Sequence, residues 1–374
     1  MDDVRRISAV LAAHGLEGAP AALPREPLED SQWNQLRATL RFQRLSGPAV
    51  AAADAGELVL TDAQRQELEE EHLQALGHVL RLERILLRVD DLLGEAAVPF
   101  AVLKGSAVAH LDYADPSLRA FGDDDILIPT EHFAAAVQAL LRAGYRRPAR
   151  EVRPGFDVRF GKGATLVGED RYELDVHRTF AMGPFGLLVD MAELWDGLDR
   201  FELGGRQLSA LGPEQRFLHA CYHAVIGNPK RRLVPYRDVA EMTLYGSHDL
   251  GRLRELAEHW GAGAVLARAL VDTWEELGLT SERPLLSWAR GRVASGREQR
   301  LLRVYTAGTS YAAQSAASLV VLPRWRDRVA LVRMLAFPGA AYTSTHGRSP
   351  VGWLLRGARR ALRVRGESPG SPRG

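Results

Sequence analysis

The sequence predicts an α+β protein in which a small mixed sheet lies between an N-terminal and a C-terminal helical region. Apolar residues recur at helical spacing through the first part of the chain and again in its second half. Between these parts, short apolar runs alternate with helix-compatible segments and turn residues. We therefore expect an N-terminal helical region at 1–95, a core at 96–200, a C-terminal helical domain at 201–365 and a disordered tail at 366–374.

The composition is that of an ordinary soluble protein. The chain has 374 residues, enough for two or three domains, and 46% of them are hydrophobic. The 48 basic and 47 acidic residues leave a net charge of +1, which predicts neither a nucleic-acid nor a membrane partner. A single cysteine, Cys221, excludes an intrachain disulfide and a cysteine zinc cluster. Because the sequence also has no signal-peptide pattern and no apolar stretch of about 18 residues, we expect a cytoplasmic protein without a membrane span.

Three helices are expected in the N-terminal region. The first ends near Gly15, and the second lies near residues 33–45. The third begins after Thr61, where Thr61 and Gln64 have the spacing of a capping box, and it continues to about Leu93. This helix is charged on one side, so its apolar stripe should dock on the core.

The core should begin with a buried strand at residues 100–103, which Lys104, Gly105 and Ser106 interrupt. A helix-compatible segment and a loop follow. A second strand then opens with three consecutive aspartates and continues through residues 126–128.

Further elements complete the core. Thr130 can cap a helix that continues to Leu141 and ends at Gly144. A hairpin turn is expected at residues 168–171, between the last two of three short strand-like runs at 156–160, 164–167 and 172–176.

The three aspartates divide between the two faces of the second strand. Successive side chains of a strand point to opposite sides, so Asp123 and Asp125 share one face, and Asp124 joins Ile126 and Ile128 on the other. Two carboxylates about 4 Å apart repel by roughly 4 kcal/mol at an effective dielectric near 20, which a bound cation or a shared proton would relieve. Magnesium favours such oxygen ligands, often with further oxygens from a substrate phosphate. The alternative is an acidic turn that is merely solvated.

This arrangement resembles the polymerase-beta-type nucleotidyltransferase superfamily, in which a Gly-Ser turn follows one strand and an Asp-x-Asp pair opens the next. It is most similar to a branch of uncharacterised nucleotidyltransferases with a Leu-Lys-Gly turn and an Arg-x-x-Gly-Asp-hydrophobic-Asp strand. Asp124 departs from that pattern, because the branch has an apolar residue there. The resemblance extends over about residues 96–245, and its core motifs are Leu103-Lys104-Gly105, Tyr113, Asp115-Pro116, Arg119, Gly122-Asp123-Asp124-Asp125 and Leu127-Ile128-Pro129.

The resemblance implies a reaction and its metal ligands. The reaction is transfer of a nucleoside monophosphate from a nucleoside triphosphate (NTP) to an acceptor, with release of pyrophosphate. Asp123 and Asp125 would hold Mg²⁺, with two ions expected. Asp175, followed by Val176 and His177, is similar to the Asp-x-His of this branch, and it would be the third catalytic and metal-binding carboxylate. The alternative for this last segment is the polar face of an edge strand.

The resemblance, together with the chemistry of individual side chains, indicates which residues would contact the nucleotide. Gly105 would allow close approach of the backbone to phosphate, and Ser106 would donate hydrogen bonds to it. Lys104 would neutralise phosphate charge, unless it is a surface lysine at a strand end. Arg119 belongs to the family motif and is also expected at the nucleotide. Arg232 is a further candidate, since Arg binds phosphate through two parallel hydrogen bonds; the alternative is a solvated loop.

The second half of the chain should be mainly helical. One helix should begin near Pro213 and carry His219 and His223 on the same face. The residues between these histidines do not fit a zinc hydrolase motif, so we expect packing or a hydrogen bond across the domain interface rather than metal binding. Further helices are expected near 249–259, 261–277, 296–306 and 326–336.

The partners are less well defined by the sequence. A basic helix at 356–365 could contact RNA or acidic lipid, but we do not expect nucleic-acid binding because only Trp353 accompanies these arginines. Members of the branch are often encoded beside peptide-maturation enzymes, so a peptide is one acceptor, with small molecules, proteins and RNA as others. Two rival functions stay open: a catalytically degenerate protein that binds nucleotide or peptide, and a phosphotransferase on the same fold.

Overall fold

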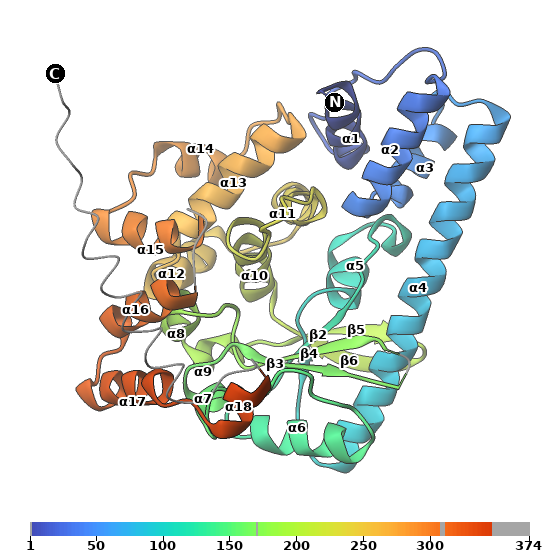
Figure 1. Cartoon of the computed structure of the whole chain (residues 1–374). Coiled ribbons are helices and arrows are strands. Elements are labelled where there is room, and N and C mark those ends of the chain that lie inside the picture. Colours follow the sequence, from blue (N-terminus) through green and yellow to red (C-terminus); the bar gives the residue numbers. More distant parts are fainter. Residues whose placement is uncertain (1, 170, 307–310, 346–374) are drawn as a thin grey trace, which may run out of the picture.

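The structure is a computed structural model that describes residues 2–169, 171–306 and 311–345. In these residues, helices surround one six-stranded mixed sheet in the order β3-β4-β2-β1-β6-β5, which confirms the α+β class (Figure 1). The strands are β1 (Ala101–Val102), β2 (Asp124–Leu127), β3 (Gly163–Val167), β4 (Glu173–His177), β5 (Asp199–Leu203) and β6 (Arg206–Ala210).

The pairing in the middle of the sheet brings distant acidic residues together. Strand β1 runs antiparallel to β2 and parallel to β6. Strand β2 runs parallel to β4, with Asp125 opposite Asp175 and Leu127 opposite His177. Two hairpins, β3–β4 and β5–β6, complete the sheet at its edges. The strand pair β5–β6 spans residues 199–210, so the sheet extends past the expected boundary at residue 200. The division into regions itself stays a proposal.

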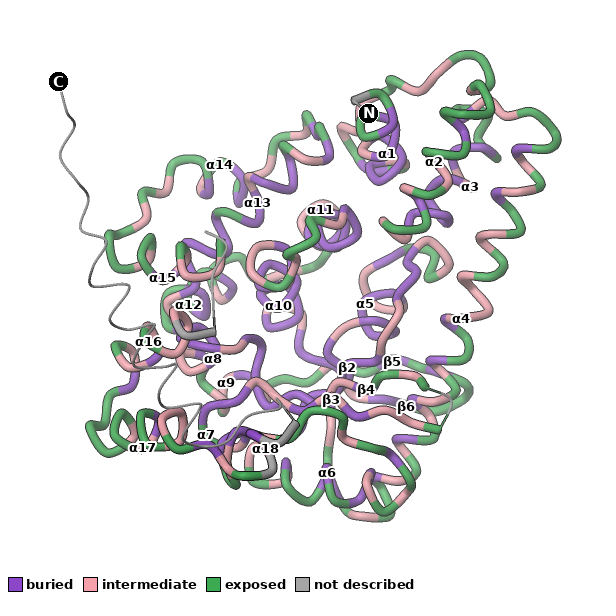
Figure 2. Tube along the Cα trace, viewed as in Figure 1, coloured by how far each residue is buried: buried purple, intermediate pink, exposed green. Residues whose placement is uncertain are grey.

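One face of the sheet is covered by helices α4 (Asp62–Glu95) and α6 (Phe133–Arg142) (Figure 1). Leu86, Val89 and Leu93 of α4 are fully buried, in the same hydrophobic cluster as Ile126 of β2. Figure 2 shows exposed and buried residues mixed along α4, as expected for a helix with one docking stripe. Thr61 caps the helix as predicted, because its hydroxyl accepts from the backbone N–H of Gln64 at 3.2 Å.

The N-terminal helices and the C-terminal half share a second hydrophobic cluster. Leu11, Leu36 and Ala52 of the first three helices belong to the same buried cluster as Val239 and Leu270. Helix α1 also contacts α11 and α13 directly. The helices of this body are α1 (Asp2–Ala13), α2 (Asp30–Gln43), α3 (Ser46–Asp54), α10 (Pro213–Val225), α11 (Val234–Tyr245), α12 (Leu250–His259), α13 (Gly263–Leu277) and α14 (Pro284–Gly291).

The remaining helices are short or lie toward the C-terminus. Helices were expected near 249–259, 261–277, 296–306 and 326–336, and α12, α13, α15 and α17 are found there. The basic segment 356–365 and the tail 366–374 lie outside the described residues. None of the helices that the structure describes combines the length and apolar character needed to cross a bilayer. The elements not yet named are α5 (Ser106–Asp112), η1 (Pro116–Leu118), α7 (Phe156–Arg159), α8 (Pro184–Leu188), α9 (Met191–Leu194), α15 (Gly296–Thr306), α16 (Tyr311–Val321), α17 (Trp325–Ala336) and α18 (Ala340–Thr345).

The strand expected at residues 156–160 is wrong, because this segment begins with the helical turn α7. The apolar residues of the segment fit both a period of two and a helical turn. Tertiary packing decides between them: Phe156 and Phe160, four residues apart, lie with ring centroids 6.0 Å apart and join a cluster with Leu322 and Leu331 from the C-terminal helices. Contacts with residues so distant in the chain were not visible in the local pattern.

Candidate active site

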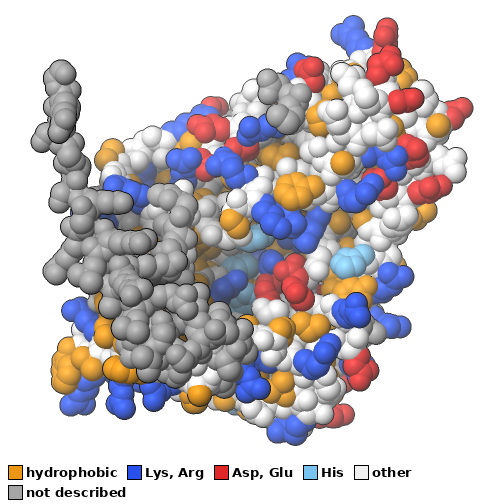
Figure 3. Space-filling view, in the orientation of Figure 1, with side chains coloured by type: hydrophobic (Ala, Val, Ile, Leu, Met, Phe, Trp, Pro, Cys, Tyr) orange, Lys and Arg blue, Asp and Glu red, His pale blue; other side chains and the backbone are white. Residues whose placement is uncertain are grey.

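A cleft with a volume of about 540 Å³ lies over the sheet face that carries Asp125. Its walls come from the Gly105 turn, strands β2 and β4, helix α10, the loop that leads to α11, and helices α15 and α16. Figure 3 shows this cleft as a hollow where basic, acidic and histidine side chains gather. Most residues proposed from the sequence line it, although they are spread over more than 100 positions of the chain.

The turn after β1 depends on glycine. Gly105 has φ 62° and ψ −117°, a conformation that residues with a Cβ rarely adopt. A Cβ built there would lie 3.3 Å from the ring of Phe121. Gly105 lines the cleft, as expected for a backbone that approaches phosphate. Ser106 does not: its side chain is fully buried, and its hydroxyl has no hydrogen-bond partner among the described residues. Its contact with phosphate stays a prediction.

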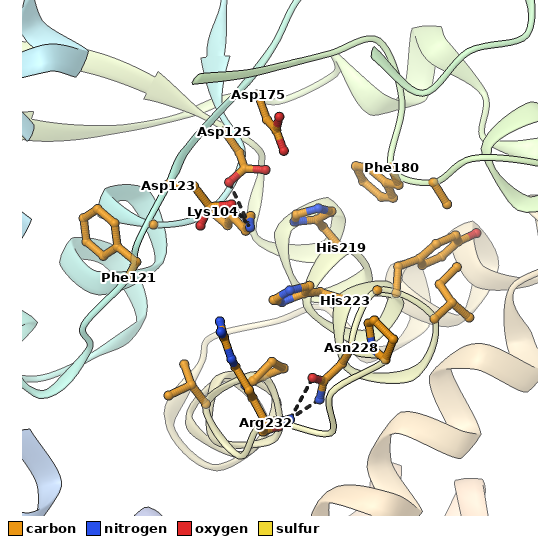
Figure 4. Close-up of a pocket in the computed structure, with 18 of the residues that line it drawn as sticks. Lys104, Phe121, Asp123, Asp125, Asp175, Phe180, His219, His223, Asn228 and Arg232 are labelled. Carbon is orange, nitrogen blue, oxygen red and sulfur yellow. Dashed lines mark hydrogen bonds and ion pairs between the residues drawn. The ribbon is translucent and has the colours of Figure 1, made fainter. Parts of the chain in front are cut away.

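The Lys104 ammonium joins the two aspartates of the second strand (Figure 4). Its Nζ lies 2.9 Å from Asp125 Oδ2 and 3.3 Å from Asp123 Oδ2. Burial alone would lower the pKa of Lys104, but the two carboxylates outweigh it and raise that pKa. Burial would likewise raise the pKa of Asp125, yet Lys104 and His177 hold it well below its usual range. Asp125 is therefore a buried, ionised carboxylate at neutral pH.

The parallel register of β2 and β4 places Asp175 beside Asp125. Ligand atoms of Asp125, Asp175 and His177 all lie within 4.8 Å of one another, which suits a metal ion. Thr165 Oγ1 donates to Asp175 Oδ1 at 2.6 Å and leaves the second carboxylate oxygen without that bond. Asp123 is not part of this group; it contacts Lys104 and lies 3.8 Å from the Arg44 guanidinium.

His177 was not among the predicted site residues, although its place on the face of Asp175 was a signal for it. Its Nε2 lies 2.8 Å from Asp125 Oδ1, and its Nδ1 is buried without a partner among the described residues. Burial lowers the pKa of His177, so the imidazole is neutral at pH 7. A neutral imidazole that donates from Nε2 would orient Asp125, and one that presents a lone pair could join the metal ligands.

Asp124 faces away from the cleft, as the strand alternation predicted. It does not line the cleft, and it is 2% exposed on the face that packs against α4 and α6. One of its carboxylate oxygens has no partner among the described residues. Burial, reinforced by the charges of Asp125 and Asp123, raises its pKa to about 8. The departure from the family pattern therefore lies behind the site rather than within it.

Arg119 forms a buried link between the core and the helical half. Its Nε and Nη2 donate to the two carboxylate oxygens of Asp238 at 2.7 and 2.8 Å, and its Nη1 donates to the carbonyl of Gly105 at 3.0 Å. The Tyr113 hydroxyl also donates to Asp238, at 2.8 Å. Arg119 thus supports the Gly105 turn directly, while Asp238 holds both Arg119 and Tyr113 in place. A contact of Arg119 with the nucleotide stays a prediction.

Several further cations line the cleft. Arg232 comes from the loop before α11, where the Asn228 side chain bonds both its N–H and its carbonyl at 2.8 Å (Figure 4). The Arg232 guanidinium lies 5.3 Å from the ring of Phe42, and its Nε is buried without a partner among the described residues. Lys162, which the sequence analysis missed, makes no ion pair within the described parts of the chain. Burial lowers its pKa, against the pull of Asp125.

The two histidines of α10 also face the cleft (Figure 4). The ring centroids of His219 and Phe180 are 4.9 Å apart, so the expected packing across the interface is present for His219. Neither imidazole makes a hydrogen bond to another described residue. Burial holds the pKa of both well below the usual value, so both are neutral. They can accept or donate one hydrogen bond each toward a bound ligand.

Some solved structures are similar to this chain at a low level. A solution structure of the antibiotic-resistance factor ANT(2'')-Ia is 16% identical, covers 48% of this chain and 91% of its own, and has a TM-score of 0.33. A crystal structure of ANT(2")-Ia in complex with adenylyl-2"-tobramycin is 17% identical. The match covers 48% of this chain and 97% of that one, with a TM-score of 0.33. A crystal structure of an antigenic nucleotidyltransferase-like protein from Paracoccidioides brasiliensis is 14% identical. The match covers 55% of this chain and 94% of that one, with a TM-score of 0.30. Similarity at this level says nothing about substrates.

The sequence itself matches a known family. No curated protein matches the chain. In contrast, the family described as "Uncharacterised nucleotidyltransferase" matches residues 29–273, about two thirds of the chain, and this range includes every candidate residue of the cleft from Arg44 to Arg232. The protein therefore belongs to the uncharacterised nucleotidyltransferase family.

Proposed function

We propose that the protein transfers a nucleoside monophosphate from an NTP to an acceptor hydroxyl, with release of pyrophosphate. The observation that carries this proposal is the register of β2 and β4, which sets Asp175 beside Asp125 in a cleft lined by the Gly105 turn. An acceptor oxygen would form a bond to the α-phosphorus as the bond to the β-phosphate oxygen breaks. The cleft would align these groups and stabilise the developing charge.

Asp123, Asp125 and Asp175 are the proposed metal ligands, with His177 as a fourth candidate. Their fit to a divalent ion is supported by the donor set, in which Asp125, Asp175 and His177 present atoms within 4.8 Å of one another. Carboxylate oxygens suit Mg²⁺ and Mn²⁺, whereas an imidazole suits ions such as Zn²⁺ or Fe²⁺. A metal bound there would supply positive charge that offsets the charge of the triphosphate. Two magnesium ions are expected at the site.

Asp175 is the proposed base for the acceptor. Thr165 holds one of its carboxylate oxygens at 2.6 Å, so the other oxygen can take the proton of the acceptor hydroxyl. Fixing the carboxylate through Thr165 also fixes where that proton goes. After the transfer, the proton on Asp175 passes to solvent through the open cleft.

The cations of the cleft would bind the triphosphate. Lys104 and Gly105 line its core side, and Arg44 and Arg232 line it from the helical body. Arg232 can donate two parallel hydrogen bonds to one phosphate, whereas Lys104 acts as a compact charge. The acceptor is open, and a peptide, a small molecule, a protein and RNA are all to be tested.

Product analysis tests the reaction. The protein is incubated with ATP, Mg²⁺ and candidate acceptors, and the nucleotide products are separated. Pyrophosphate is expected, and Asp125→Asn, which removes the ionised carboxylate at the centre of the site, should release none. ADP in place of pyrophosphate would identify a phosphotransferase. Binding of magnesium–ATP without any product from any acceptor would favour a catalytically degenerate protein.

A further inference from the structure

Lys104 contacts both aspartates of the second strand at once. Its ammonium lies 2.9 Å from Asp125 Oδ2 and 3.3 Å from Asp123 Oδ2, and its side chain is only 18% exposed (Figure 4). A buried ammonium needs a counter-charge, and this one has two carboxylates within 3.3 Å. The two carboxylates are also the pair that the proposed function assigns to the metal.

The other oxygens of these carboxylates already have neighbours. Asp125 Oδ1 lies 2.8 Å from His177 Nε2, and Asp123 Oδ1 lies 3.8 Å from the guanidinium of Arg44. Lys104 therefore contacts the Oδ2 atom of each carboxylate, while His177 and Arg44 lie at the Oδ1 atoms. A divalent ion shared by Asp123 and Asp125 would compete with Lys104 for these oxygens, because two cations cannot occupy one position between them.

A place for the displaced ammonium is close at hand. Lys104 immediately precedes Gly105, and both residues line the cleft. A lysine side chain has a flexible four-carbon stem and an ammonium with three N–H donors. The ammonium can therefore move to a phosphate bound at the Gly105 turn without a change in the backbone. A metal that arrives alone offers no such phosphate, and it would leave Lys104 buried and unpaired.

We propose that Lys104 pairs with Asp123 and Asp125 and leaves them only when metal ion and triphosphate bind together. The metal ion and the triphosphate should therefore each bind tightly only when the other is present. This inference rests on the proposed function, since it takes Asp123 and Asp125 as metal ligands. The affinity of the cleft for a metal ion is then low in the absence of nucleotide. Because such coupling is reciprocal, its affinity for a nucleotide without metal is low as well.

Metal binding with and without nucleotide tests this role. Mn²⁺ serves as the probe, and the fraction bound to the full-length protein is measured by electron paramagnetic resonance. Compared with the wild type, Lys104→Met should bind Mn²⁺ alone about tenfold more tightly and the Mn²⁺ complex of a non-hydrolysable ATP analogue about tenfold more weakly. A merely structural role of Lys104 would weaken both.

Two further variants separate charge from side-chain loss. Lys104→Arg keeps the positive charge, so its affinity for Mn²⁺ alone should stay as weak as that of the wild type. Lys230→Met removes one positive charge from the exposed rim of the same cleft, where Lys230 makes no ion pair with a described residue, and it should change neither affinity by more than about threefold. Lys104→Gln is a second neutral variant in case Lys104→Met is unstable.

Thermal unfolding gives an independent readout. Without its counter-ion, the aspartate pair should lower the Tm of Lys104→Met, and Mn²⁺ should raise that Tm by more than it raises the Tm of the wild type. If both neutral variants bind Mn²⁺ no more tightly than the wild type, while the wild type binds the Mn²⁺–nucleotide complex, the role of Lys104 is wrong and the proposed function stands. If the wild type does not bind that complex, both are wrong.

Discussion

Asp124 and Asp125 are adjacent in sequence and have opposite surroundings. Asp125 faces the cleft, where Lys104 and His177 hold it as a carboxylate. Asp124 lies among apolar side chains on the other face, and burial raises its pKa to about 8. The alternation of a strand was enough to predict which of the two faces the site. The counter-ion of Asp125 was not predictable, because the position of a flexible lysine depends on the turn that carries it.

Replacing Asp124 by the apolar residue typical of the family should stabilise the fold and spare activity. The carboxyl group of Asp124 is buried and has an oxygen without a partner, whereas valine suits a buried strand. We expect Asp124→Val to raise the free energy of unfolding by about 1–3 kcal/mol, measured by urea denaturation. Pyrophosphate release should stay within several-fold of the wild type. A loss as large as that of Asp125→Asn would place Asp124 in the active site.

The Gly105 turn is the element on which the nucleotide side of the cleft depends. Its conformation requires glycine, and Arg119 supports its carbonyl from behind. Gly105→Ala should cost about 1–3 kcal/mol of stability, from the strained backbone and the contact with Phe121, and should weaken nucleotide binding. Gly94→Ala is the matched control, since a Cβ there meets no atom within 4 Å and the residue is helical. Equal melting temperatures of the two variants would show that the turn tolerates a side chain.

The link between Arg119 and Asp238 joins the loop before β2 to α11. Both side chains are almost completely buried, so a loss of the paired geometry leaves charge unsatisfied. Arg119→Lys keeps the charge and loses the two parallel hydrogen bonds. We therefore expect the free energy of unfolding without nucleotide to fall by about 3 kcal/mol, measured by denaturant unfolding. If Arg119→Lys leaves stability unchanged and weakens only nucleotide binding, Arg119 acts at the phosphate and not in this link.

Local signals predicted individual elements better than their assembly. The capping box at Thr61 and the alternation in β4 lie within a few residues, so the sequence was sufficient for both. The turn α7 was mistaken for a strand because its partners are C-terminal helices. Likewise, the Arg119–Asp238 link spans 119 positions, and Lys162 reaches the site only through the β3–β4 hairpin. A single sequence carries no direct signal for such distant contacts.

At the scale of the whole molecule, the site lies between the sheet and the helical body that the N-terminal helices form with the C-terminal half. The sheet supplies the carboxylates, while the N-terminal helices and the C-terminal half supply cations and histidines over them. Arg44 and Arg232 both reach the cleft from this helical body, and burial, together with the charge of Arg232, lowers the pKa of Arg44. Two close cations favour an anionic ligand between them.

Arg232 tests whether the helical body contacts the nucleotide. Arg232→Ala should weaken binding of magnesium–ATP by about 1.5–3 kcal/mol, the cost of a lost hydrogen bond to a charged group, as measured by calorimetry. Lys230→Ala, at the exposed rim of the same loop, is the control and should have a smaller effect. Unchanged affinity in Arg232→Ala would assign Arg232 to the surface of the loop.

We propose that the protein is an active transferase and that Asp175 is the third carboxylate of its site. Asp175→Asn keeps the size of the side chain and an oxygen for Thr165, but it removes the base. Glu173→Gln, on the same strand and also lining the cleft, is the matched control and should turn over at a rate close to that of the wild type.

The most direct measurement is the rate of pyrophosphate release by Asp175→Asn at saturating magnesium–ATP and acceptor, with nucleotide affinity measured by calorimetry on the same preparation. Because Asp123 and Asp125 can hold the metal-bound triphosphate without Asp175, we predict a nearly unchanged Kd for magnesium–ATP. The rate should be at least about 100-fold below the wild type, the low end for general-base catalysis. Turnover by Asp175→Asn at the wild-type rate would contradict the assignment of Asp175.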